Sequence, residues 1–123
     1  MSDDESTGFR IAVYGTLKRG YGNHRLLMRA RFLGTDHLNS IVLHDLGPCP
    51  GAVDQPSQGI VVEVYEVDER TFERVDALEG YNARAPERGE YTRQLRDTRF
   101  GAAWVYFYNG SVRGFRRITR GAW

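Results

Sequence analysis

Glu79 is the first residue in this sequence whose type and position could carry chemistry. It lies in the segment DALEGY, directly before Gly80, and glycine is the residue type that most often ends a helix. A carboxylate in the last turn faces the negative end of the helix dipole, which disfavours it by about 0.3–1 kcal/mol. The dipole, together with burial, would raise the pKa of Glu79 toward the value that a general base needs. An ordinary exposed glutamate beside a helix stop fits the same pattern.

A glycine-rich turn, YGTLKRGYGN, is the second candidate and covers residues 14–23. It follows a predicted strand and precedes a predicted helix, so its backbone amides could bind a phosphate or a carboxylate. It has neither the Lys-Ser/Thr pair of a Walker loop nor a GxGxxG pattern. Local sequence leaves open both an anion-binding loop and a plain connection between two elements.

Other kinds of site find less support. The three histidines and Cys49 lack the close spacing of a metal site, and no serine lies in a GxSxG segment. Three aromatic residues alternate along a predicted strand, and we interpret them as core packing rather than as a base-stacking surface: Trp104, Tyr106 and Tyr108.

Composition bounds the class of protein. The chain has 123 residues, of which 41% are hydrophobic and 27% charged, which predicts one globular domain over residues 9–123. Residues 1–8 are acidic and read as a disordered tail. No apolar run is long enough to span a membrane, and because the first residues are acidic and lack an apolar stretch, we expect no signal peptide. With a single cysteine, the expected location is the cytoplasm.

The charge balance disfavours a nucleic-acid partner for the domain as a whole, because the formal net charge is only +1. Sixteen of the seventeen basic residues are arginine, and residues 98–123 contain five of them and no carboxylate. This Arg-rich end could contact an anion or nucleic acid, although we interpret it as a solvated rim.

The elements that must position these residues form a mixed α+β pattern. Asn23 and Asp68 can each cap a helix, and residues 47–51 are predicted to be irregular because they contain two prolines and two glycines. The strand over residues 59–67 is apolar on both faces, so we expect it to be central in the sheet. Strands are predicted at 9–14, 41–44, 59–67, 90–96 and 102–108, and helices at about 23–31 and 69–78.

Together these segments resemble the gamma-glutamylcyclotransferase-like family, and especially its short gamma-glutamylamine cyclotransferase members. The resemblance covers most of residues 10–110 in family order, in VYGTLKRGYGNHRLL, LGPCPGAV, GIVVEVYEVDE, DALEGY, GEYTR and AAWVYFYNG. It implies a small mixed β-barrel flanked by helices. It also implies a reaction in which the α-amine of a gamma-glutamyl substrate attacks the substrate's own γ-carbonyl. This attack releases 5-oxoproline and an amine, and needs no metal or cofactor.

The resemblance assigns roles to individual residues. Glu79 matches the catalytic glutamate, which would act as general acid and base. Asn23 and His24 match positions that support the substrate loop. The expected substrate-binding residues are Tyr14, Gly15, Thr16, Leu17 and Tyr91.

Two segments depart from the family pattern and leave the leaving amine open: the loop over residues 81–90 and the Arg-rich end. A non-catalytic small-molecule binding module on the same fold is the first alternative function. An RNA- or protein-interaction domain that uses the Arg-rich end is the second.

Overall fold

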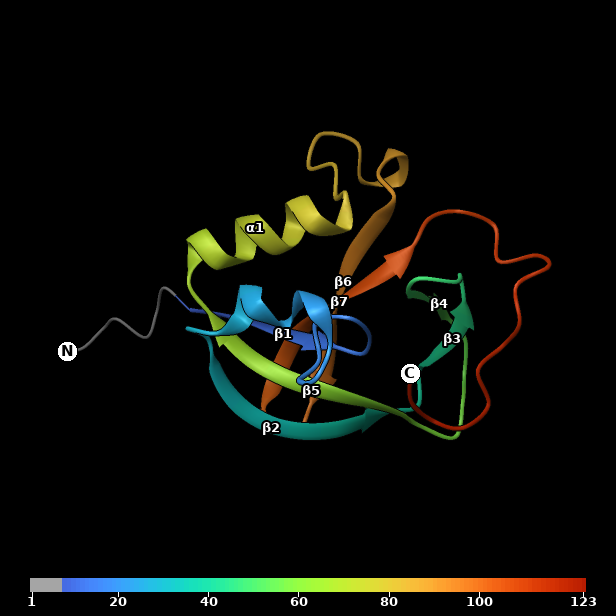
Figure 1. Cartoon of the computed structure of the whole chain (residues 1–123), viewed down its shortest axis with the longest axis horizontal. Helices are drawn as coiled ribbons and strands as arrows, with labels where there is room; N and C mark the ends of the chain where they lie inside the picture. Colours follow the sequence, from blue (N-terminus) through green and yellow to red (C-terminus); the bar gives the residue numbers. More distant parts are fainter. Residues whose placement is uncertain (1–7) are drawn as a thin grey trace.

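A curled sheet of five strands, in the order β2-β5-β1-β7-β6, dominates the computed structural model, which describes residues 8–123 (Figure 1). Neighbouring strands run antiparallel, except that β1 and β7 are parallel. The strands are β1 (Phe9–Val13), β2 (Arg31–Leu38), β5 (Ile60–Val67), β6 (Tyr91–Thr98) and β7 (Gly101–Tyr108). Apart from Gly8, the tail predicted at residues 1–8 lies outside the described residues.

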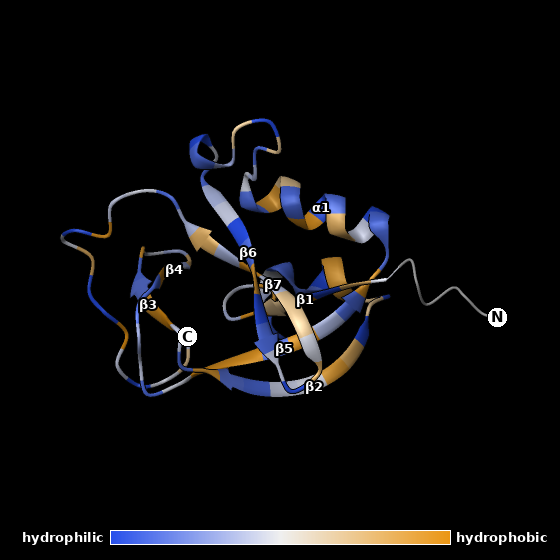
Figure 2. Cartoon of the chain, turned by 180° about the vertical axis from the view of Figure 1, so that it is seen from behind, coloured by the Kyte–Doolittle hydropathy of each residue, from blue (hydrophilic) through white to orange (hydrophobic). Residues whose placement is uncertain are grey.

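A hairpin and a helix cover the two faces of this sheet. The hairpin consists of β3 (Ile41–Asp45) and β4 (Pro50–Asp54), and the helix is α1 (Glu69–Glu79). Alternate residues of β1 point to opposite faces, as the pleat requires. Ala12 belongs to a core cluster with the hairpin residues Ile41 and Leu43, whereas Ile11 belongs to a second cluster with Val75 of α1. In Figure 2, α1 carries both hydrophobic and hydrophilic residues, as a helix with one side on a sheet should.

This architecture confirms the mixed α+β class predicted from the sequence. The strands divide between a five-stranded and a two-stranded sheet, and closure into a barrel is not confirmed. The expected central strand is β5, which pairs with β1 on one side and β2 on the other. In the described part of the chain, no helix is long and apolar enough to cross a membrane.

The helix α1 begins and ends where its local sequence predicts. The Asp68 side chain accepts a hydrogen bond from the Thr71 amide at 2.8 Å, which caps the first turn. Gly80 ends the helix with φ of 67°, a left-handed conformation that glycine adopts without strain. The helix runs one residue further than predicted, so Glu79 is its last residue.

The predicted helix over residues 23–31 is wrong. The chain forms only a 3-10 helix, η2 (Gly22–Leu27), and the residue at its N-cap is Tyr21. The Asn23 side chain donates instead to Thr16 Oγ1 at 2.9 Å. The chain then enters β2, a strand that the sequence analysis missed because its residues are half exposed and its pairing with β5 is interrupted between Phe32 and Gly34.

The prediction of irregular structure over residues 47–51 is also wrong in part. Pro50 and Gly51 begin β4 and pair with Asp45 and His44 of β3. Proline is tolerated as the first residue of a strand, where the hydrogen bond that it cannot donate is not needed. A second short 3-10 helix, η3 (Pro86–Arg88), lies in the loop between α1 and β6.

Candidate active site

One pocket brings together all six residues that the sequence analysis proposed for the site. Its volume is about 240 Å³, and it lies where the end of β1, the start of β4, the end of α1, the start of β6 and the middle of β7 meet. The six predicted residues that line it are Tyr14, Gly15, Thr16, Leu17, Glu79 and Tyr91. A concave site with a few polar groups is the usual form of a small-molecule site.

Glu79 is partly buried in this pocket at the C-terminal end of α1. No hydrogen bond or ion pair between residues 8–123 involves its carboxylate. Burial, and then the charges of Glu90 and Asp76, raise the pKa of Glu79 to about 7. A carboxyl group with this pKa can both accept and donate a proton near neutral pH.

The loop from Tyr14 to Leu17 is held by bonds that leave its own amides available. Asn23 donates to Thr16 Oγ1, and a ring nitrogen of His24 lies 2.9 Å from the Leu17 carbonyl oxygen. These contacts confirm that Asn23 and His24 support the loop. Among the described residues, no hydrogen-bond acceptor is paired with the amides of Gly15, Thr16 or Leu17. Free amides at a strand end can bind a carboxylate.

Tyr14 anchors the start of the loop to the neighbouring strands. Its buried hydroxyl donates to the Tyr106 carbonyl at 2.7 Å and accepts from the Ala52 amide at 3.3 Å. Burial raises the pKa of Tyr14 well above its ordinary value, so the hydroxyl stays neutral. The side chain therefore contributes a fixed wall rather than an ionisable group.

Tyr91 is also engaged with the protein. Its hydroxyl donates to the Pro50 carbonyl at 2.8 Å and lies 3.5 Å from Cys49 Sγ. Burial raises the pKa of Tyr91, so it too remains protonated. Because its proton is already donated to Pro50, the Tyr91 hydroxyl has only its acceptor lone pairs to offer to a further group.

Comparison with known proteins identifies the family to which this arrangement belongs. The family model for gamma-glutamyl cyclotransferase, AIG2-like, matches residues 11–123. The chain belongs to the gamma-glutamyl cyclotransferase, AIG2-like family.

Members of the family resemble this chain over most of its length. The gamma-glutamylcyclotransferase family protein YtfP of Escherichia coli K12 is 40% identical over 115 residues, which cover 93% of this chain and 95% of YtfP. The solution structure of E. coli ytfP has a TM-score of 0.74 at 38% identity, covering 94% of this chain and 96% of that one. The crystal structure of the uncharacterized protein PH0828 from Pyrococcus horikoshii has a TM-score of 0.76 at 36% identity, covering 93% and 88%.

Several residues at the site of this family member escaped the sequence analysis. Glu90 and Tyr106 line the pocket, and so does Cys49, which the sequence analysis considered only as a possible metal ligand. The alternation of Tyr106 with Trp104 and Tyr108 pointed to the core, and nothing in the local sequence distinguished Glu90 from a surface residue. Their proximity to Glu79 follows from the packing of β6 and β7 beside α1.

The charges around the pocket are of one sign. Glu79 and Glu90 line it, and no lysine or arginine of residues 8–123 does so. Within the same residues, no group of three or more His, Cys, Asp or Glu side chains could hold a metal ion. The pocket is thus an acidic cavity beside a loop with free amides.

Proposed function

We propose that this chain is a cyclotransferase that cleaves a gamma-glutamyl amide and releases 5-oxoproline and an amine. Family membership supports a cyclotransferase-type function. The observation that carries the proposal is the state of Glu79. Its carboxylate has no partner among residues 8–123, has a pKa of about 7, and faces a pocket beside free backbone amides.

In the proposed reaction Glu79 moves one proton. Its carboxylate takes a proton from the α-ammonium of the substrate, which frees the nitrogen lone pair to attack the γ-carbonyl carbon. The new C–N bond closes a five-membered ring, and the C–N bond to the leaving amine breaks. Glu79 then gives the proton to the leaving nitrogen. The ring nitrogen still carries two hydrogens after the attack, and it releases one of them to solvent or to the departing amine, which leaves as an ammonium ion. The lactam is then neutral, and Glu79 ends in its starting state.

The loop would supply orientation. The free amides of Gly15, Thr16 and Leu17 are suited to the α-carboxylate of the glutamyl group, since oriented backbone amides form anion sites. Holding the glutamyl chain folded brings its amine onto its own carbonyl, and such intramolecular positioning can account for much of the rate. Neutral Tyr14 and Tyr91 complete the walls of the site.

The pocket charges favour one class of leaving group. Glu90 adds a second carboxylate, and no cation of residues 8–123 lines the pocket to pair with a carboxylate on the leaving group. We therefore expect gamma-glutamyl derivatives of amines, and in particular of amines with a second positive charge, to react faster than gamma-glutamyl amino acids.

The proposal is tested by incubating the purified protein with a panel of gamma-glutamyl amides and measuring 5-oxoproline. Glu79→Gln retains the shape and hydrogen-bonding capacity of the side chain but cannot accept the proton. Its turnover should fall by about 10²–10⁴-fold, the usual contribution of a positioned proton-transfer group. If the wild type binds these compounds without forming 5-oxoproline, the chain is a binding module instead.

A further inference from the structure

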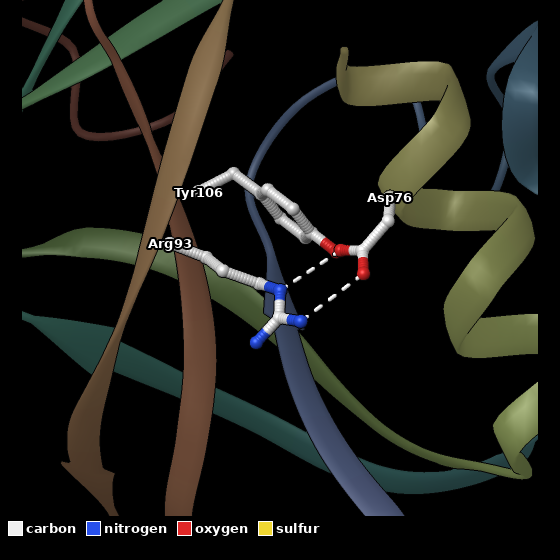
Figure 3. Close-up of polar contacts among 3 residues, drawn as sticks. All are labelled: Asp76, Arg93 and Tyr106. Atoms are coloured by element: carbon white, nitrogen blue, oxygen red, sulfur yellow. Dashed lines mark hydrogen bonds and ion pairs between the residues drawn. The ribbon is translucent and has the colours of Figure 1, made fainter. Parts of the chain in front are cut away.

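A cluster of three polar residues lies close to Glu79, near the C-terminal end of α1. Asp76 precedes Glu79 by one turn of α1. Arg93 of β6 donates from Nε and Nη2 to the two carboxylate oxygens of Asp76, at 2.9 and 3.1 Å. Tyr106 of β7 donates its hydroxyl to the same carboxylate (Figure 3). One carboxylate therefore joins the end of α1 to two neighbouring strands.

Arg93 is held in place by aromatic rings as well as by its ion pair. Its guanidinium carbon lies 4.2–4.4 Å from the ring centroids of Tyr81, Phe72 and Trp104. The side chains of Arg93 and Asp76 are only 15% and 20% exposed. Bidentate geometry and stacking on rings are the two properties that make arginine irreplaceable by lysine at such a position. This is a built arrangement, unlike a surface ion pair.

The cluster reaches the pocket through Tyr106. Tyr106 lines the pocket, and its hydroxyl donates to Asp76. Its backbone carbonyl accepts the hydrogen bond from the Tyr14 hydroxyl. Tyr106 thus connects the end of α1 with the start of the 14–17 loop. Movement of Asp76 would disturb both sides of the pocket.

We propose that Asp76, Arg93 and Tyr106 form a positioning unit for Glu79. The unit fixes the last turn of α1 against β6 and β7, and it places an ion-paired carboxylate one turn away from the proposed base. Its role in catalysis rests on the proposed function of Glu79, whereas its effect on the ionisation of Glu79 does not.

The charges of Asp76 and Arg93 allow a positioning role toward Glu79 to be distinguished from a general contribution to the stability of the fold. Asp76 is the only one of the residues facing Glu79 that forms an ion pair with a described residue, and that partner is Arg93. Removing the Asp76 charge should make Glu79 easier to ionise, whereas removing the Arg93 charge should make it harder. The titratable groups that face Glu79 from the elements around it are Tyr14, Cys49, Asp76, Glu90, Tyr91 and Tyr106.

The experiment is a carboxyl-carbon NMR titration of the whole protein, with glutamate labelled and the Glu79 signal assigned by its loss in Glu79→Gln. In Asp76→Asn the titration midpoint of Glu79 should fall below that of the wild type, and in Arg93→Gln it should rise. Arg96→Gln is the matched control. Arg96 also lies on β6, pairs with Asp54 at 3.1 Å and stacks on Phe107, but its carboxylate partner belongs to β4 and not to α1. The titration midpoint of Glu79 in Arg96→Gln should match that in the wild type.

A milder variant separates geometry from charge. Arg93→Lys keeps the positive charge but loses the bidentate contact and the stacking, so the midpoint should stay near that of the wild type. Turnover should nonetheless drop by about 10–100-fold, mainly in kcat, because a misplaced proton-transfer group loses alignment.

The outcomes are separable. Unchanged midpoints, or shifts in the same direction, in Asp76→Asn and Arg93→Gln would overturn the positioning unit. Wild-type turnover in Arg93→Lys would do the same. Should the wild type form no 5-oxoproline, the proposed function fails, and the titration still decides whether the unit controls Glu79.

Discussion

Gly15 lies so close to Pro50 that a Cβ atom on Gly15 would come within 2.8 Å of Pro50 Cγ and 2.9 Å of Pro50 Cδ. The backbone of the loop after β1 therefore packs directly against the ring of Pro50, the first residue of β4. Gly15 is not among the glycines with positive φ, so this contact, and not a left-handed conformation, is what requires glycine there. Both residues line the pocket.

Gly15→Val should weaken binding of a gamma-glutamyl ligand, because the side chain must displace Pro50 or the loop. Overpacking of this kind commonly costs about 1–3 kcal/mol, and the same cost in the free energy of binding would lower the affinity by roughly 5- to 150-fold. Calorimetric titration of wild type and variant gives the comparison. Thr16→Ser serves as the control, since it keeps the hydroxyl that accepts from Asn23. Equal affinity in both variants would argue against the loop as the binding element.

The rate should depend on pH through Glu79. A base with a pKa of about 7 is ionised above that pH and protonated below it. We therefore expect kcat/KM to fall about tenfold for each pH unit below 7, as the carboxylate is lost. A profile of kcat/KM between pH 5 and 9 measures this midpoint. A midpoint near 4.5, the ordinary value for glutamate, would contradict the role of burial.

The same shift predicts a pH-dependent stability difference between wild type and Glu79→Gln. Because the folded state raises the pKa of Glu79 above 4.5, the stabilisation from its protonated form is fully present below pH 4.5. That stabilisation is lost as the pH rises through about 7, at a cost of up to about 3 kcal/mol. Glu79→Gln should therefore become more stable relative to the wild type as pH increases. Urea unfolding at pH 5 and pH 8 tests the sign.

Tyr91→Phe should reduce both stability and activity. The Pro50 carbonyl, on a buried residue, would lose the hydroxyl that donates to it at 2.8 Å. An unsatisfied buried acceptor costs about 1–3 kcal/mol in the free energy of unfolding. Tyr108→Phe is a matched control, because Tyr108 packs edge-on against Tyr91 and its hydroxyl bonds to no group among residues 8–123. Equal stability of the two variants would show that the bond to Pro50 contributes nothing.

Leaving-group charge should affect turnover through Glu90. Three gamma-glutamyl amides of similar length test this: one from a diamine, one from an alkylamine and one from an amino acid. We expect kcat/KM to decrease in that order, and Glu90→Gln to reduce the advantage of the diamine. Because Glu90 is exposed, the effect should be roughly two- to fivefold, typical of an exposed charge pair. An unchanged order and spacing in Glu90→Gln would exclude it from substrate selection.

The sequence by itself determined the features that depend on near neighbours. Asp68 directly precedes α1 and caps it by accepting from an amide three residues further on, and Gly80 directly follows the helix, so both limits could be predicted. The apolar residues on both faces of β5 are likewise visible within the segment itself, and they predicted a central strand. Glu79 was identified as a candidate because its place at a helix end is a local property.

Tertiary structure alone decided the rest, because it depends on residues that are distant in the chain. The strand β2 is half exposed and exists through its pairing with β5, and Pro50 became a strand residue through β3. Asn23 supports a loop instead of capping a helix because Thr16 lies within reach. The pKa of Glu79 is raised by burial and by the charges of Glu90 and Asp76, and Asp76 is paired with Arg93, 17 residues further along the chain. Burial and charge depend on distance in space, which local sequence patterns do not encode.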